Sequence, residues 1–129
     1  MNRTITNIIY NTKTAALINK YYSLKTSDTK DFIFVATTGR SGTLTLVDIF
    51  NQLDNCIALH EPYPAMQADL LHASAYGDDK KVEEFYKIRK SINIRRSAAG
   101  YKHYLEANHL FIKTFISYAV KDFGSRIKV

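Results

Sequence analysis

Residues 37–43, with the sequence TTGRSGT, combine the residue types that bind an anionic group. Glycines let the main chain turn tightly and let a ligand approach it, hydroxyls donate hydrogen bonds, and a guanidinium can bind two anionic oxygens at once. If a helix follows, its unpaired N–H groups and the positive end of its dipole also favour an anion. We therefore predict a phosphate or sulfate site here, against the simpler alternative of an ordinary turn capped by one hydroxyl. The candidate ligands are Thr38, Gly39, Arg40, Ser41, Gly42 and Thr43.

This segment does not match the phosphate loop of nucleotide triphosphatases, which reads G-x-x-x-x-G-K-[ST]. If Gly39 is the second glycine of that pattern, the first falls on Phe34, inside an apolar stretch. If Gly42 takes that place instead, Thr43 stands at the lysine position. No apolar stretch ends in an aspartate suited to bind Mg²⁺. A metal-dependent nucleotide kinase is therefore an alternative with less support, and we predict no metal site.

Glu61 directly follows the apolar residues 56–60 and is a candidate general base. Ligands of open α/β sheets bind at the carboxyl ends of the strands, so a carboxylate there can take a proton from a bound hydroxyl. His60 is the competing base, because neighbouring side chains of a strand point to opposite sides. In a third interpretation neither residue is a base, and Glu61 pairs with a helix N-terminus. The other three histidines are interpreted as ordinary surface or core residues, whereas Asn108 and Lys113 could reach an acceptor or a leaving group.

The elements that would position these residues are strands alternating with helices. Residues 32–36 are apolar, β-branched and aromatic without alternation, which is typical of a strand buried on both faces of a parallel sheet. We therefore predict an α/β fold with a parallel sheet covered by helices. The expected helices are residues 4–22, 44–53, 65–76, 79–92 and 110–123, the last ended by Gly124 in a left-handed cap. The expected strands are residues 32–36, 56–60 and 101–107 and a strand that begins at residue 126, and residues 23–31 are expected to form a polar linker.

The composition limits the class of protein further. The chain has 129 residues and a net charge of +6, from 18 Lys and Arg against 12 Asp and Glu. A single cysteine, Cys56, excludes an internal disulfide framework and a cysteine-based zinc site. The longest apolar run is far shorter than the roughly 20 residues that span a bilayer, so we expect a soluble, cytoplasmic protein. We expect an N-terminal helix and linker over residues 1–31 and the main domain over residues 32–129.

The whole net charge lies in residues 80–102, where eight basic residues stand against two glutamates. Such a segment favours an anionic partner, for example a phosphorylated cofactor, an acidic acceptor or nucleic acid. It is also typical of a solvated helix face. A nucleic-acid-binding fragment is therefore another alternative, although the segment has no recognised reading motif and no aromatic stacking platform.

Residues 38–43, between a predicted buried strand and a predicted helix, resemble the loop with which sulfotransferases bind the 5′-phosphosulfate of 3′-phosphoadenosine 5′-phosphosulfate (PAPS). The arginine in place of a lysine resembles the bacterial, carbohydrate and tyrosyl-protein branches of that family. A second match is Leu59-His60-Glu61-Pro62, because in those branches a glutamate at about this place is the catalytic base. A third and weaker match is YLEAN at residues 104–108, followed by an apolar helix and residues 126–129. The sequence departs from many relatives at Leu44, where they have a second threonine, and the motif for the 3′-phosphate would lie beyond Val129.

The resemblance implies a sulfotransferase that moves a sulfuryl group from PAPS to a hydroxyl of a carbohydrate or a protein tyrosine, without a metal ion. It implies that Arg40 and Glu61 are catalytic and that residues 38–43 bind the donor. It also implies a P-loop-like domain of three layers, of which this chain would be the N-terminal portion.

Overall fold

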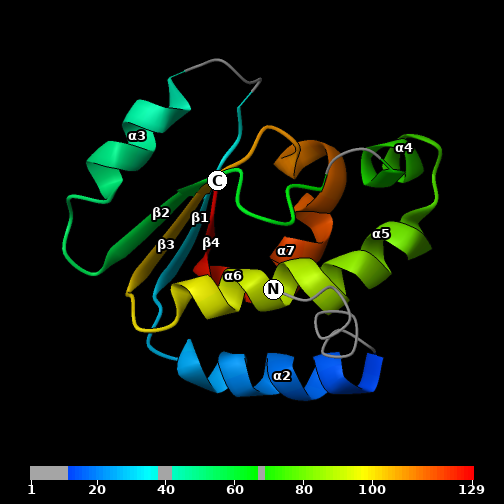
Figure 1. Cartoon of the computed structure of the whole chain (residues 1–129), viewed down its shortest axis with the longest axis horizontal. Helices are drawn as coiled ribbons and strands as arrows, with labels where there is room; N and C mark the ends of the chain where they lie inside the picture. Colours follow the sequence, from blue (N-terminus) through cyan, green and yellow to red (C-terminus); the bar gives the residue numbers. More distant parts are fainter. Residues whose placement is uncertain (1–11, 38–41, 67–68) are drawn as a thin grey trace, which may run out of the picture.

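The sheet has four strands, all of them parallel, in a computed structural model that describes residues 12–37, 42–66 and 69–129. The spatial order is β2-β3-β1-β4 (Figure 1). The strands are β1 (Asp31–Val35), β2 (Cys56–His60), β3 (His103–Ala107) and β4 (Ile127–Lys128). Ala107 pairs with both Val35 and His60, so the carboxyl ends of β1, β2 and β3 are level at one edge of the sheet.

One face of the sheet carries the larger core. Phe32 and Phe34 of β1 are completely buried there, and Phe34 stacks on Phe111 with the ring centroids 4.5 Å apart. Phe32 stacks in the same way on Phe123, at 4.0 Å. The helices that cover this face are α4 (Asp69–Ala75), α5 (Asp79–Phe85), the π-helix η1 (Tyr86–Lys90), α6 (Ser91–Ala98), the π-helix η2 (Phe111–Phe115) and α7 (Ile116–Phe123).

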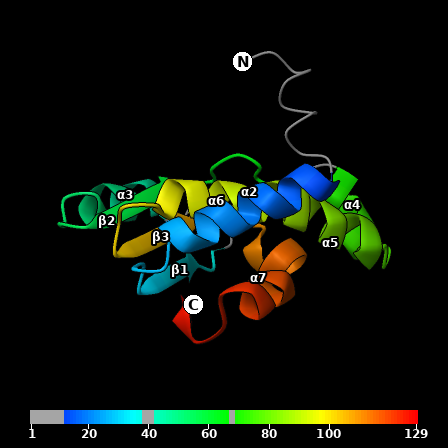
Figure 2. The same ribbon diagram turned by 90° about the horizontal axis from the view of Figure 1, so that it is seen from below.

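Among the described helices, α3 (Thr43–Phe50) is the one that covers the opposite face (Figure 1). Its Val47 packs against Ala58 and Leu105, and the neighbouring Ile33 and Val35 of β1 point to the same side. Helix α2 (Thr12–Lys25) lies outside the larger helical layer, where Ala15 packs against Ile92 of α6 (Figure 2). The predicted α/β class, with a parallel sheet between helices, is therefore confirmed.

The connections leave two neighbouring strands on opposite faces of the sheet. The chain leaves β1 toward α3 on one face, and it leaves the adjacent β3 toward α7 on the other face. In open α/β sheets such a reversal between neighbouring strands opens a crevice outside their carboxyl ends, and ligands bind there.

The predicted elements are largely confirmed, with shifted ends. The strand at 56–60 has the predicted bounds, and the other three begin within two residues of the expected positions. Of the predicted N-terminal helix, residues 4–11 lie outside the described residues, and α2 runs to Lys25, three residues past the expected end. The predicted linker is therefore shorter than expected, because it begins after α2 and ends before Asp31 of β1.

Three expectations about helices are corrected. The predicted helix 44–53 ends at Phe50, because the side chain of Asn51 leaves the helix to bond both backbone groups of Ala58, at 2.8 and 2.9 Å. The predicted helix 79–92 continues to Ala98, with a π-helix in its middle. Gly124 ends α7 as expected, but with φ 55° and ψ −128° it is not in the left-handed helical conformation. The chain turns there instead into η3 (Gly124–Arg126) and β4.

Candidate functional site at the carboxyl edge of the sheet

The predicted anion site lies mostly outside the described residues. This holds for Thr38, Gly39, Arg40 and Ser41, so their arrangement is not described. The last two predicted ligands are described at the start of α3. Gly42 has φ 76° and ψ 21°, a left-handed conformation that a glycine adopts without steric cost, and it directly precedes the first helical residue, Thr43. Because Gly42 has no side chain to cap α3, amides of the first turn remain candidates to bind an anion.

Glu61 stands at the same edge, immediately after β2. Its N–H donates to the carbonyl of Ala107 at 2.9 Å, which extends the pairing of β2 with β3 by one residue. Its φ of 44° is unusual, because a left-handed backbone costs a residue with a Cβ roughly 1–2 kcal/mol. Strain of this kind persists only where the surroundings hold the residue, and it is concentrated at functional sites.

The carboxylate of Glu61 is in hydrogen-bond contact with His109, through Oε1 and the ring nitrogen Nδ1. The two side chains are 25% and 33% exposed, so a ligand at the carboxyl edge of the sheet could reach both. His109 follows β3 by two residues, which explains why it meets a residue from the end of β2. The sequence favours an ordinary surface or core histidine at His109 and does not predict this contact. His60, the competing base, is an exposed residue at the end of β2.

A buried polar network lies beneath this edge. Glu106 of β3 is completely buried, and its carboxylate accepts from Lys90 Nζ at 2.5 Å, from Tyr104 Oη at 2.7 Å and from Asn108 Nδ2 at 3.0 Å. Burial raises the pKa of Tyr104 well above its usual value, and the negative charge of Glu106 adds to this. Burial also lowers the pKa of Lys90, although the carboxylate of Glu106 acts in the opposite direction.

The network anchors the segments that carry Glu61 and His109. Lys90 Nζ lies 3.5 Å from the carbonyl of Pro62, the residue after Glu61. Asn108, the residue before His109, accepts from the N–H of Leu110 at 2.9 Å while it donates to Glu106. Asn108 is buried and engaged in these bonds, which does not favour its predicted contact with an acceptor; Lys113 is exposed.

The basic segment is not one charged surface. Lys90 and Arg95 are buried, and each pairs with a carboxylate from outside the segment, Glu106 and Asp122 respectively. The other basic residues of the segment are at least partly exposed, as expected for a solvated face: Lys80, Lys81, Lys87, Arg89, Arg96 and Lys102.

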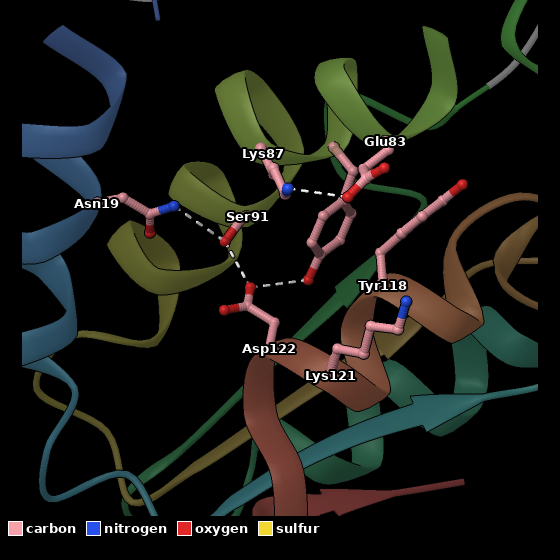
Figure 3. Close-up of a pocket in the computed structure, with 8 residues that line it drawn as sticks. Asn19, Glu83, Lys87, Ser91, Tyr118, Lys121 and Asp122 are labelled. Atoms are coloured by element: carbon pink, nitrogen blue, oxygen red, sulfur yellow. Dashed lines mark hydrogen bonds and ion pairs between the residues drawn. The ribbon is translucent and has the colours of Figure 1, made fainter. Parts of the chain in front are cut away.

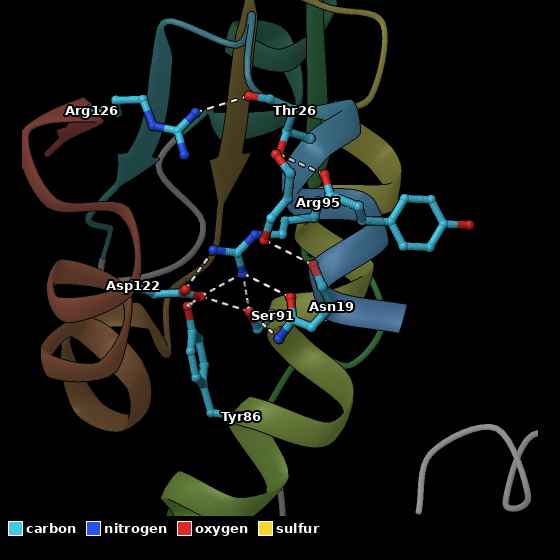
Figure 4. Close-up of polar contacts among 9 residues, drawn as sticks. Asn19, Thr26, Tyr86, Ser91, Arg95, Asp122 and Arg126 are labelled. Atoms are coloured by element: carbon cyan, nitrogen blue, oxygen red, sulfur yellow. Dashed lines mark hydrogen bonds and ion pairs between the residues drawn. The ribbon is translucent and has the colours of Figure 1, made fainter. Parts of the chain in front are cut away.

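A second polar cluster joins three helices away from the carboxyl edge. Arg95 of α6 binds Asp122 of α7 through both terminal nitrogens, at 2.5 and 2.9 Å, and also donates to Asn19 of α2 at 3.0 Å (Figure 4). Ser91 and Tyr86 donate to the same carboxylate, at 2.6 and 2.9 Å. A pocket of about 310 Å³ opens beside this cluster (Figure 3). None of the residues predicted for a site lines this pocket.

Other kinds of site find little support in the described part of the chain. Within it, no group of three or more His, Cys, Asp or Glu side chains is arranged to hold a metal ion. No helix of the described ranges has the length and apolar character to cross a membrane. Cys56 is buried at the start of β2, and burial raises the pKa of its thiol, which disfavours a role as a nucleophile.

Searches against known protein families, curated proteins and solved structures found no match to this chain. The site is therefore interpreted from its own residues and geometry.

Proposed function

We propose that the chain binds the donor of a sulfotransferase reaction and moves a sulfuryl group from PAPS to a hydroxyl of a carbohydrate or a protein tyrosine. The observation that carries the proposal is the partly exposed carboxylate of Glu61, at the edge of the sheet where β1 leads through residues 38–42 into α3. A proton acceptor and a glycine-bounded helix start are the two parts that metal-free sulfuryl transfer requires.

Each part has a defined chemical task. Arg40 and the amides at the start of α3 would stabilise the negative charge that develops on the sulfuryl oxygens and on the leaving phosphate. Glu61 would take the proton of the acceptor hydroxyl. The acceptor oxygen then bonds to sulfur, the bond between sulfur and the bridging phosphate oxygen breaks, and adenosine 3′,5′-bisphosphate leaves.

The base can be tested with Glu61→Gln, which keeps the size of the side chain and removes its charge. We expect kcat for transfer of ³⁵S from labelled PAPS to a tyrosine peptide or an oligosaccharide to fall by about 100-fold or more. Donor affinity measured by calorimetry should remain within about twofold. Glu84→Gln, which changes an exposed carboxylate of α5, is the matched control. Unchanged turnover in Glu61→Gln, with a loss in His60→Gln, would assign the base to His60.

The donor loop can be tested with Arg40→Ala. Loss of hydrogen bonds to a charged group should weaken PAPS binding by about 10- to 100-fold without added Mg²⁺. Intact affinity in the calorimeter would contradict the assignment of residues 38–43.

The alternatives draw less support. A nucleic-acid interface would use the cations of residues 80–102, and two of the eight, Lys90 and Arg95, are buried in ion pairs. A nucleotide kinase would need the phosphate-loop pattern that residues 37–43 lack.

A further inference from the structure

We propose that His109 is a positioning residue for Glu61: its Nδ1–H holds one carboxylate oxygen, so that the other faces the bound acceptor. This inference rests on the proposed function. It starts from the contact between His109 Nδ1 and Glu61 Oε1, which joins residues 48 positions apart in the sequence.

The backbone of Glu61 is fixed, but its side chain needs a second support. The N–H of Glu61 is held by the carbonyl of Ala107 at 2.9 Å, and the positive φ turns the chain away from β2. Among the described residues, His109 is the side chain that contacts the carboxylate. Without it, the carboxylate would lose this hydrogen bond at the carboxyl edge of the sheet.

His109 is itself well placed to give that support, because its neighbours are immobilised. Asn108 is 1% exposed and bonds both Glu106 and the N–H of Leu110, and Leu110 is buried. The support therefore runs from the buried carboxylate of Glu106, through Asn108, to the backbone of His109.

Exposure separates this pair from the buried ion pair of Lys90 and Glu106. Lys90 and Glu106 are 1% and 0% exposed, so no ligand reaches them, whereas Glu61 and His109 are 25% and 33% exposed. When Nδ1–H donates to Oε1, the second oxygen, Oε2, is left for the acceptor hydroxyl. Glu61 takes the proton, and His109 keeps its own.

The test compares two substitutions of His109 in the full chain. His109→Ala removes the donor, and we expect kcat for ³⁵S transfer from PAPS to the acceptor used above to fall by about 10- to 100-fold, because a misplaced catalytic group costs that much. The Kd for adenosine 3′,5′-bisphosphate should stay within about twofold. His109→Asn keeps an N–H donor near the position of Nδ1, and kcat should return to within about threefold of the wild type.

His103 offers a matched control at the opposite edge of the sheet. Its Nδ1 lies 2.8 Å from Asp31 Oδ2 with similar exposure, so it forms an equivalent pair at the amino ends of β1 and β3. His103→Ala should leave kcat within about twofold. If His109→Asn is as slow as His109→Ala, the imidazole itself takes the proton and the positioning role is wrong.

A second readout does not depend on activity. Long-range ¹H–¹⁵N NMR spectra at neutral pH should show a protonated Nδ1 on His109 in the wild type, and its shift should change in Glu61→Gln. A bare Nδ1 would overturn the inference whatever the activity. If sulfuryl transfer is equally fast in His109→Ala, only the role of His109 is contradicted. If the wild type transfers no sulfuryl group, the proposed function is contradicted together with that role.

Discussion

At the scale of single residues, the most unusual feature is the ion pair of Lys90 and Glu106, which is 1% and 0% exposed. Removing two charges from water costs several kcal/mol for each ion, and the attraction between them offsets this only when the remaining hydrogen bonds are made. Here Tyr104 and Asn108 supply those bonds to Glu106. We therefore interpret the pair as fixing the positions of the segments at the carboxyl edge of the sheet, and not as a source of net stability.

Lys90→Met should lower the free energy of unfolding by about 3–5 kcal/mol, because it leaves the charge of Glu106 buried without its partner. Adding Glu106→Gln should restore at least about half of that loss, since the double variant buries no unpaired charge. Urea denaturation followed by circular dichroism measures both changes. Lys87→Met is the control, because the pair of Lys87 with Glu83 is open to solvent and contributes little. A double variant as unstable as Lys90→Met would show that packing, not charge, dominates the cost.

At the scale of elements, the cluster around Asp122 holds α2, α6 and α7 together (Figure 4). Burial alone would raise the pKa of Asp122. The hydrogen bonds and charge of Arg95, with the hydrogen bonds from Ser91 and Tyr86, outweigh it and leave this pKa below its usual value. The folded protein therefore binds this proton less tightly than the unfolded chain does.

The pH dependence of stability follows from that difference. The contribution of Asp122 is fully present above the pKa of an aspartate in the unfolded chain, and it is lost as the pH falls through the lower pKa of the folded state. In the range between the two, the unfolded chain binds more protons, so stability rises with pH. Urea denaturation between pH 2 and pH 7 should show a shallower acid loss in Asp122→Asn than in the wild type. Asp28→Asn, at an exposed position, should keep the wild-type slope; equal slopes in all three proteins would contradict this assignment.

The π-helix η1 changes which side chains of the helical segment 79–98 face inward. A 3.6-residue period places Val82, Phe85, Tyr86 and Arg89 on one face. In the structure Val82, Tyr86 and Lys90 are buried, because the i→i+5 bonds of η1 widen the turn and bring Lys90 inward. This local change brings Lys90 close enough to Glu106 for the buried ion pair to form.

At the scale of the whole molecule, stability depends on the aromatic core between the sheet and the larger helical layer. Phe34 is at its centre, where it contacts the rings of Tyr104, Phe111 and Phe115. The opposite face has only α3, among the described helices, and a smaller core around Val47.

Phe34→Ala should therefore lower the free energy of unfolding by about 3–5 kcal/mol, through lost burial and the cavity left behind. Leu44→Ala on α3, where the side chain is 63% exposed, should change it by less than about 0.5 kcal/mol. Thermal or urea unfolding of the two variants measures the contrast. A similar loss in both would mean that Leu44 is covered in solution.

Local sequence patterns were sufficient to predict the elements and the edge of the sheet that carries the candidate site. The apolar run at 32–36 and the closing residues 59–61 predicted where β1 and β2 end, and the carboxyl ends of parallel strands meet by necessity at one edge. Glu106 carried a signal too, since a charge between Leu105 and Ala107 in an apolar strand requires a buried partner.

The sequence by itself determined the α/β class, the approximate strands and the presence of Glu61 at a strand end. Buried helices and strands need apolar residues in characteristic patterns, and such a pattern can be recognised within a short stretch of sequence. Only the tertiary structure decided the partners: His109 for Glu61, Lys90 for Glu106 and Asp122 for Arg95. Those contacts depend on the register of the strands and on the rotation of the helices, which no short stretch of sequence specifies. From the sequence, a charged residue could therefore be given a chemical role, but its partner far away in the chain could not be predicted.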